Sequence, residues 1–109
     1  MVSNIIRFTP QAKNDIDQAI AHIINEFCDK QAAKKLYDTL LKVVDRVRSF
    51  PNSSKLTDNE LFKNANVRQA LVNNYLLFYL YDESKSTVVI LRFIYAKRSI
   101  ADLLKEISI

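Results

Sequence analysis

Apolar residues in the first half of the chain recur at helical spacing. In residues 12–27 and again in residues 33–47 they stand three or four positions apart, with charged and polar residues between them. This periodicity predicts two amphipathic helices, each with one apolar face. Asp29 lies in the short interval between them and can cap the second helix, which must end near residue 50 because Pro51 follows. The two helices are therefore expected to form an antiparallel hairpin.

The second half of the chain changes to the pattern of β-strands. Residues 67–72, 75–81 and 86–95 are rich in β-branched and aromatic side chains. They are separated by Asn73-Asn74 and by the polar residues 82–85, and both separators predict turns. Asparagine tolerates positive φ and can replace glycine in a tight turn. This part of the chain is expected to form a three-stranded antiparallel meander.

Short segments at the two ends complete the predicted topology. The apolar segment Val2–Phe8 precedes Thr9-Pro10, a pair typical of a helix start, so it predicts an N-terminal strand. Ser99 and Asp102 resemble a helix capping box, and the apolar positions 100, 103, 104 and 107 predict a short C-terminal helix. The predicted fold class is α+β, with an N-terminal strand, a helical hairpin, a three-stranded antiparallel meander and a short C-terminal helix.

Counting outward from the two predicted turns assigns the strand residues to the faces of the sheet. The first turn places Arg68 opposite Tyr79, and the second places Tyr75 opposite Arg92. Alternation then gathers these arginines and the tyrosines on one face, while the other face carries Leu71, Leu76, Phe78, Leu80 and Leu91. By residue type, the leucine-rich face is expected to pack against the helices and to leave the arginines and tyrosines in a groove. A register error of one residue would exchange the two faces.

The charge of Arg92 needs a partner because its strand is otherwise apolar. Burial of an unpaired cation is costly, so we expect Arg92 to pair with a carboxylate of the first helix, Asp15 or Asp17. Arg68 has two open interpretations, a solvated residue of an edge strand or a contact for a phosphate or an acidic partner. His22 is expected at the surface, in a weak i,i+4 pairing with a glutamate.

The composition limits the classes of protein to which the chain can belong. Its 109 residues form one predicted domain, residues 1–109, and 49% hydrophobic with 26% charged residues is typical of a globular protein. The absence of glycine excludes glycine-rich phosphate loops and the nucleophile elbow. A single cysteine, Cys28, excludes an intramolecular disulfide and a cysteine zinc site, and we expect neither a metal nor a cofactor. The formal net charge of +4 fits an anionic partner without requiring one.

The hydropathy pattern indicates neither secretion nor a membrane span. The N-terminus lacks an apolar run of signal-peptide length, and no stretch approaches 18 uncharged apolar residues. A lone cysteine fits a reducing compartment. A cytoplasmic location without membrane contact is therefore expected.

The order and spacing of five segments resemble the RelE/ParE superfamily of bacterial type II toxins. These segments are Phe8–Ile16, Phe50-Pro51, Val67-Arg68, Asn74–Tyr79 and Val88–Arg98. The resemblance extends over nearly the whole chain. It implies a small basic toxin that a cognate antitoxin neutralises.

The superfamily contains two mechanisms on one scaffold. RelE-like members cut mRNA on the ribosome, where an RNA 2′-hydroxyl attacks the adjacent phosphate, whereas ParE-like members inhibit DNA gyrase by binding it. By resemblance, an endoribonuclease would place Arg68 and Arg98 on the phosphate, supported by Lys97, and use Tyr95 in proton transfer. The arginine that commonly follows the first tyrosine of the central strand is Leu76 here, and no tyrosine or histidine follows Arg98. This incomplete catalytic set favours the ParE-like interpretation.

In the ParE-like interpretation the chain acts by binding proteins. Its expected partner-binding residues are Arg68, Tyr75, Tyr79, Lys97 and Arg98. The antitoxin is expected to lay its C-terminal segment along the exposed apolar face of the sheet and the basic groove. The expected target is DNA gyrase, with the ribosome and mRNA as the alternative. A third interpretation is a toxin fold that only binds a partner and no longer arrests growth.

Overall fold

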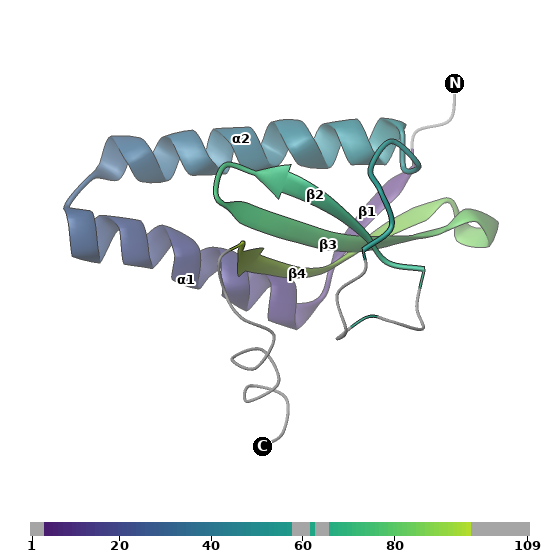
Figure 1. Cartoon of the computed structure of the whole chain (residues 1–109), viewed down its shortest axis with the longest axis horizontal. Coiled ribbons are helices and arrows are strands. Elements are labelled where there is room, and N and C mark those ends of the chain that lie inside the picture. Colours follow the sequence, from purple (N-terminus) through teal and green to yellow (C-terminus); the bar gives the residue numbers. More distant parts are fainter. Residues whose placement is uncertain (1–3, 58–61, 63–65, 97–109) are drawn as a thin grey trace, which may run out of the picture.

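The computed structural model describes residues 4–57, 62 and 66–96, and its elements follow the predicted order (Figure 1). The chain runs through β1 (Ile5–Phe8), α1 (Pro10–Phe27), α2 (Lys30–Ser49), β2 (Arg68–Val72), β3 (Tyr75–Asp82), the 3-10 helix η2 (Glu83–Lys85) and β4 (Thr87–Tyr95). The α+β class, the N-terminal strand, the helical hairpin and the meander are confirmed. The predicted C-terminal helix lies outside the described residues.

Local sequence explains where the two helices begin. Pro10 takes the first helical position of α1, and the Thr9 hydroxyl accepts a hydrogen bond from the Ala12 N–H (3.0 Å). The Asp29 carboxylate caps α2 by accepting from the Ala32 N–H (2.9 Å). Figure 1 shows the helices lying side by side and antiparallel. Among the described residues, no helix is both long and apolar enough to cross a membrane.

The sheet has the strand order β1-β4-β3-β2. Strands β2, β3 and β4 form the predicted antiparallel meander, and β1 joins the outer side of β4 as a parallel strand. Because α1 begins two residues after β1 ends, this parallel pairing holds the first turns of α1 beside β4. The pairing of β1 with β4 therefore decides which strand lies beside α1.

The register between β2 and β3 is the predicted one, but the register between β3 and β4 is not. Arg68 pairs with Tyr79 across the first turn, as expected. Tyr75 pairs with Tyr95 and not with Arg92, so that part of the prediction is wrong. The second turn occupies residues 83–86 and not the predicted 82–85, which moves the partners on β4 by two positions, and a β-bulge between Phe78 and Tyr79 moves them by one more. Counting from the predicted turn includes neither its displacement nor the bulge.

The helices cover the face of the sheet that carries the tyrosines, so the predicted assignment of the faces is wrong. The buried core consists of Ala12, Ala19, Leu36, Leu40, Val43 and Val47 from the helices and Ala70, Val72, Leu77, Tyr79, Val88, Ile90 and Phe93 from the sheet. Tyrosine is amphipathic: the ring of Tyr79 is buried while its hydroxyl donates to the Pro51 carbonyl oxygen (2.9 Å). The Tyr81 hydroxyl likewise donates to Asn4 Oδ1 (3.2 Å). Ranking the faces by residue hydrophobicity alone misses this use of tyrosine.

The opposite face of the sheet buries a second, smaller cluster. Val67, Phe78 and Ile94 are buried there, and the Phe62 ring lies 4.9 Å from the Phe78 ring between centroids. Leu71, on the same face, is exposed. This face is thus divided between a packed cluster and an exposed edge.

Candidate partner-binding site

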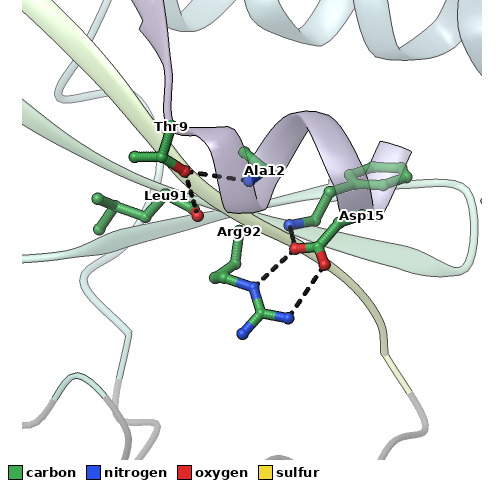
Figure 2. A network of polar contacts seen from close by, with 6 residues as sticks. Thr9, Ala12, Asp15, Leu91 and Arg92 are labelled. Atoms are coloured by element: carbon green, nitrogen blue, oxygen red, sulfur yellow. Dashed lines mark hydrogen bonds and ion pairs between the residues drawn. The ribbon is translucent and has the colours of Figure 1, made fainter. Parts of the chain in front are cut away.

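The first turns of α1 are bound to β4 at the point where β1 ends (Figure 2). The Thr9 hydroxyl donates to the Leu91 carbonyl oxygen at 2.9 Å. The Asp15 carboxylate accepts from Arg92 Nε (2.7 Å), from Arg92 Nη2 (3.0 Å) and from the Phe93 N–H (3.0 Å). Because both side chains are buried, this ion pair is a structural anchor. The predicted pairing of Arg92 with a carboxylate of the first helix is confirmed, and Arg92 does not lie in an open groove.

Arg68 and Tyr79 lie together beside the segment that follows α2. Arg68 is half-buried, and its Nη1 donates to the Ser54 carbonyl oxygen at 2.6 Å. The Tyr79 ring is fully buried and reaches the Pro51 carbonyl oxygen. Of these two predicted partner-binding residues, only Arg68 has surface that a partner can contact.

Tyr75 and Tyr95 lie together at the other end of the meander. The Tyr75 ring stacks on the Phe93 ring, with centroids 4.7 Å apart, and meets the Tyr95 ring edge to face at 5.5 Å. Burial raises the pKa of Tyr75 above its ordinary value of 10.0, and the neighbouring Tyr95 raises it further. The Tyr75 phenol therefore stays protonated at neutral pH, which makes Tyr75 a poor general base. Lys97 and Arg98, which follow this strand, lie outside the described residues.

The structure does not bring Arg68 close to Tyr95. Arg68 on β2 pairs with Tyr79 of β3, whereas Tyr95 on β4 pairs with Tyr75 of β3. Tyr75 and Tyr79 are four residues apart on that strand. At roughly 3.3 Å per residue and about 4.8 Å per strand, the two backbone positions are about 13 Å apart along the strands and about 10 Å apart across them. The predicted catalytic residues that the structure describes therefore form no single site.

A cavity of about 750 Å³ lies between α1 and the ends of β3 and β4. Five aromatic side chains line it: His22 and Phe27 from α1, and Tyr75, Phe93 and Tyr95 from the sheet. We call it the aromatic cavity. The His22 and Phe27 rings meet edge to face at 5.9 Å between centroids. The sequence places His22 at the surface, which is correct, but periodicity alone carries no signal that β4 ends beside it.

A second hollow of about 610 Å³ lies between α1 and α2. Its apolar lining is Ile16, Ile20, Ala21, Ile24, Ala33 and the half-exposed ring of Tyr37, and its charged lining is Asp17, Lys30 and Lys34. We call it the helix groove. The position of Lys30 and Lys34 beside this apolar hollow depends on how the two helices pack. In the described part of the chain, no three His, Cys, Asp or Glu residues are grouped so that they could hold a metal ion.

Comparison with known proteins places this fold in a family. The family described as the ParE toxin of type II toxin-antitoxin system, parDE, matches residues 6–100. The chain belongs to the ParE toxin family. It is therefore a toxin of a type II toxin-antitoxin system, as its resemblance to the RelE/ParE superfamily implies. A search of curated proteins found no match.

Solved structures of toxin-antitoxin systems share the fold of this ParE family member. A chain of the chromosomal ParDE system from P. aeruginosa superposes with a TM-score of 0.69 at 15% identity, covering 87% of this chain and 98% of that one. The RelBE2 complex from Mycobacterium tuberculosis gives 0.59 at 25% identity, covering 89% and 97%. The RelE-RelB complex from Pyrococcus horikoshii gives 0.58 at 13% identity, covering 90% and 100%. Since ParE and RelE proteins both superpose, the fold alone does not distinguish their targets.

Proposed function

We propose that this ParE family member arrests growth by binding DNA gyrase. The separation of Arg68 from Tyr95 carries the proposal. Cleavage by a 2′-hydroxyl needs a proton-transfer group and a cation around one phosphate, each within about 3 Å of the reacting atoms. The guanidinium of Arg68 donates to Ser54 at the far end of the meander from Tyr95. A toxin that acts by binding needs no such constellation.

An mRNA endoribonuclease is the alternative, and one observation favours it. His22 lines the same cavity as Tyr95, so a group that can transfer protons lies near the end of β4. Arg98, three residues after Tyr95, would then be the candidate for binding the phosphate. Against this alternative, none of the described residues that line the cavity is a lysine or an arginine.

The antitoxin partner is proposed to dock in the helix groove. The groove offers an apolar floor of isoleucines and a tyrosine, with Lys30 and Lys34 beside it. An amphipathic helix with an apolar stripe and acidic flanks complements such a surface. The structures that share the fold include toxin-antitoxin complexes, which supports a cognate antitoxin for this chain. On the outer sheet face, by contrast, the packed Phe62 cluster leaves less apolar surface for a partner.

The proposal is tested by a pulse of induced expression in bacteria without antitoxin, following labelled thymidine and labelled amino acid minute by minute. Thymidine incorporation is expected to fall first while translation continues. In parallel, protein from cell-free synthesis is expected to inhibit DNA supercoiling by purified gyrase. Translation that collapses first, with mRNA cut on purified ribosomes, would instead establish the endoribonuclease. Growth that stays normal, with the protein folded and abundant, would leave a toxin fold that only binds a partner.

A further inference from the structure

The aromatic cavity differs in charge from the rest of this basic chain. The formal net charge is +4, yet no lysine or arginine is among the described residues that line the cavity. Its charged lining residue is Asp15, whose carboxylate is held by Arg92 and the Phe93 N–H. A phosphate or carboxylate entering the cavity would meet no cation from these residues. These lining residues thus offer no counter-charge to an anionic ligand, and Asp15 is already paired, so any attraction for a cation comes from the aromatic rings.

The rings of the cavity form two walls with exposed aromatic surface. Phe27 on the helix wall is 67% exposed and Tyr95 on the sheet wall is 41% exposed. Exposed aromatic side chains around a hollow are typical of protein interfaces, where they act as rigid anchors. The faces of such rings carry partial negative charge and attract cations within about 6 Å. Aromatic rings from both walls can therefore contact a cation that enters the cavity.

We propose that the aromatic cavity receives an arginine side chain of the toxin's target protein. The inference rests on the proposed function, a toxin that acts by binding a protein. Arginine fits better than lysine because its guanidinium is flat, stacks on rings and is less strongly hydrated than an ammonium group. Each ring contact is expected to strengthen binding by roughly 2- to 30-fold.

The cavity and the helix groove use different residues of α1. Gln18, His22 and Phe27 line the cavity, whereas Ile20 and Ile24 line the helix groove. The two hollows share no lining residue. Substitutions can therefore remove target binding without touching the proposed antitoxin surface, and the two roles can be separated by experiment.

The chemistry of the site is tested by NMR titration of the purified full chain with N-acetyl-arginine methylamide. Saturable shifts of the Tyr75 and Tyr95 ring signals are expected, weakened at least fivefold by Phe27→Leu. Phe50→Leu is the matched control, because Phe50 is 65% exposed and does not line the cavity. Equal binding of the glutamine analogue, stronger binding of AMP, or no saturable shift would overturn the proposal. Tighter binding of the arginine analogue to the Arg98→Gln variant would overturn the proposal too. It would mean that Arg98 of this chain competes with the analogue for the cavity.

The biological role is tested by expressing the same variants in the thymidine-pulse experiment, with antitoxin binding measured by calorimetry. Phe27→Leu is expected to delay the fall in thymidine incorporation severalfold and to bind antitoxin as the unsubstituted chain does. Phe50→Leu is expected to act as the unsubstituted chain in both assays. If the unsubstituted chain and Phe27→Leu stop DNA synthesis equally fast, the arginine inference is wrong and the proposed function stands. If the unsubstituted chain stops translation first, the proposed function fails instead.

Discussion

Asp15 holds three hydrogen bonds that join α1 to β4, and few other side chains in the described ranges connect elements so far apart in sequence. Its partners, Arg92 and Phe93, lie 77 and 78 residues away. Burial of a charge is tolerated only with a partner, so removing either member takes away the counter-charge that the other has inside the protein. The anchor also holds the last part of β4 against α1. Phe93 and Tyr95 lie in this part of the strand and line the aromatic cavity.

Asp15→Ala is expected to lower the free energy of unfolding by about 3–5 kcal/mol, the range for breaking a buried ion pair. Asp45→Ala is the matched control, because Asp45 pairs with Arg48 at 2.8 Å on an exposed helix surface. An exposed pair contributes at most about 1 kcal/mol. Urea unfolding followed by circular dichroism measures both. Equal losses in the two variants would contradict the anchoring role of Asp15.

At the scale of elements, the chain makes its turns without a single glycine. Within residues 4–57, 62 and 66–96, positive φ is taken by Cys28 at 48°, Asn73 at 52° and Ser86 at 47°. They lie at the end of α1, in the β2–β3 turn and after η2, respectively. Asparagine adopts this conformation readily, but cysteine and serine are strained there by their Cβ atoms. The junctions at Cys28 and Ser86 are therefore less stable than the same backbone would be with glycine at these positions.

Cys28→Gly is expected to stabilise the protein by about 1 kcal/mol, because glycine removes the Cβ clash at the end of α1. The corresponding rise in Tm is about 4 °C, measured by thermal unfolding. Cys28→Ala serves as the control, since alanine removes the thiol but keeps Cβ. A similar rise in Cys28→Ala would show that the thiol, and not the backbone conformation, limits stability.

At the scale of the whole molecule, α1 lies between two hollows of opposite character. The aromatic cavity has no lysine or arginine among its described lining residues, whereas the helix groove has Lys30 and Lys34. One small domain can therefore offer separate binding surfaces to two partners, one for an acidic helix and one for a cationic side chain. A partner that binds only the native chain also stabilises it, by about 2.7 kcal/mol at a hundredfold excess over Kd.

Tyr37→Asp is expected to weaken antitoxin binding at least tenfold, because it places a carboxylate on the apolar floor of the groove where acidic flanks would dock. Leu41→Asp is the matched control: Tyr37 and Leu41 are 48% and 47% exposed on the same helix, and Leu41 does not line the groove. Calorimetry measures the affinity, and the antitoxin-induced rise in Tm checks it. Equal losses for both variants would place the antitoxin elsewhere on α2.

The sequence by itself determined the helices and strands of the described residues, the α+β class, the β2–β3 register and the pairing of Arg92 with a helix carboxylate. These features depend on local causes: apolar periodicity, caps such as Thr9 and Asp29, a two-residue turn, and the cost of burying a charge. The family resemblance, too, rests on the order of such segments. The toxin assignment therefore did not need the tertiary structure.

Only the tertiary structure decided which face of the sheet the helices cover and which residues surround each hollow. Both faces are apolar enough to form a core, and the choice depends on the summed packing of many long-range contacts, including the buried ring of Tyr79 with its hydroxyl at the edge. The bulge in β3–β4 and the parallel pairing of β1 with β4 then place Tyr95 and His22 around the same cavity. No periodicity encodes that proximity, because it arises from strand pairing between segments more than 70 residues apart.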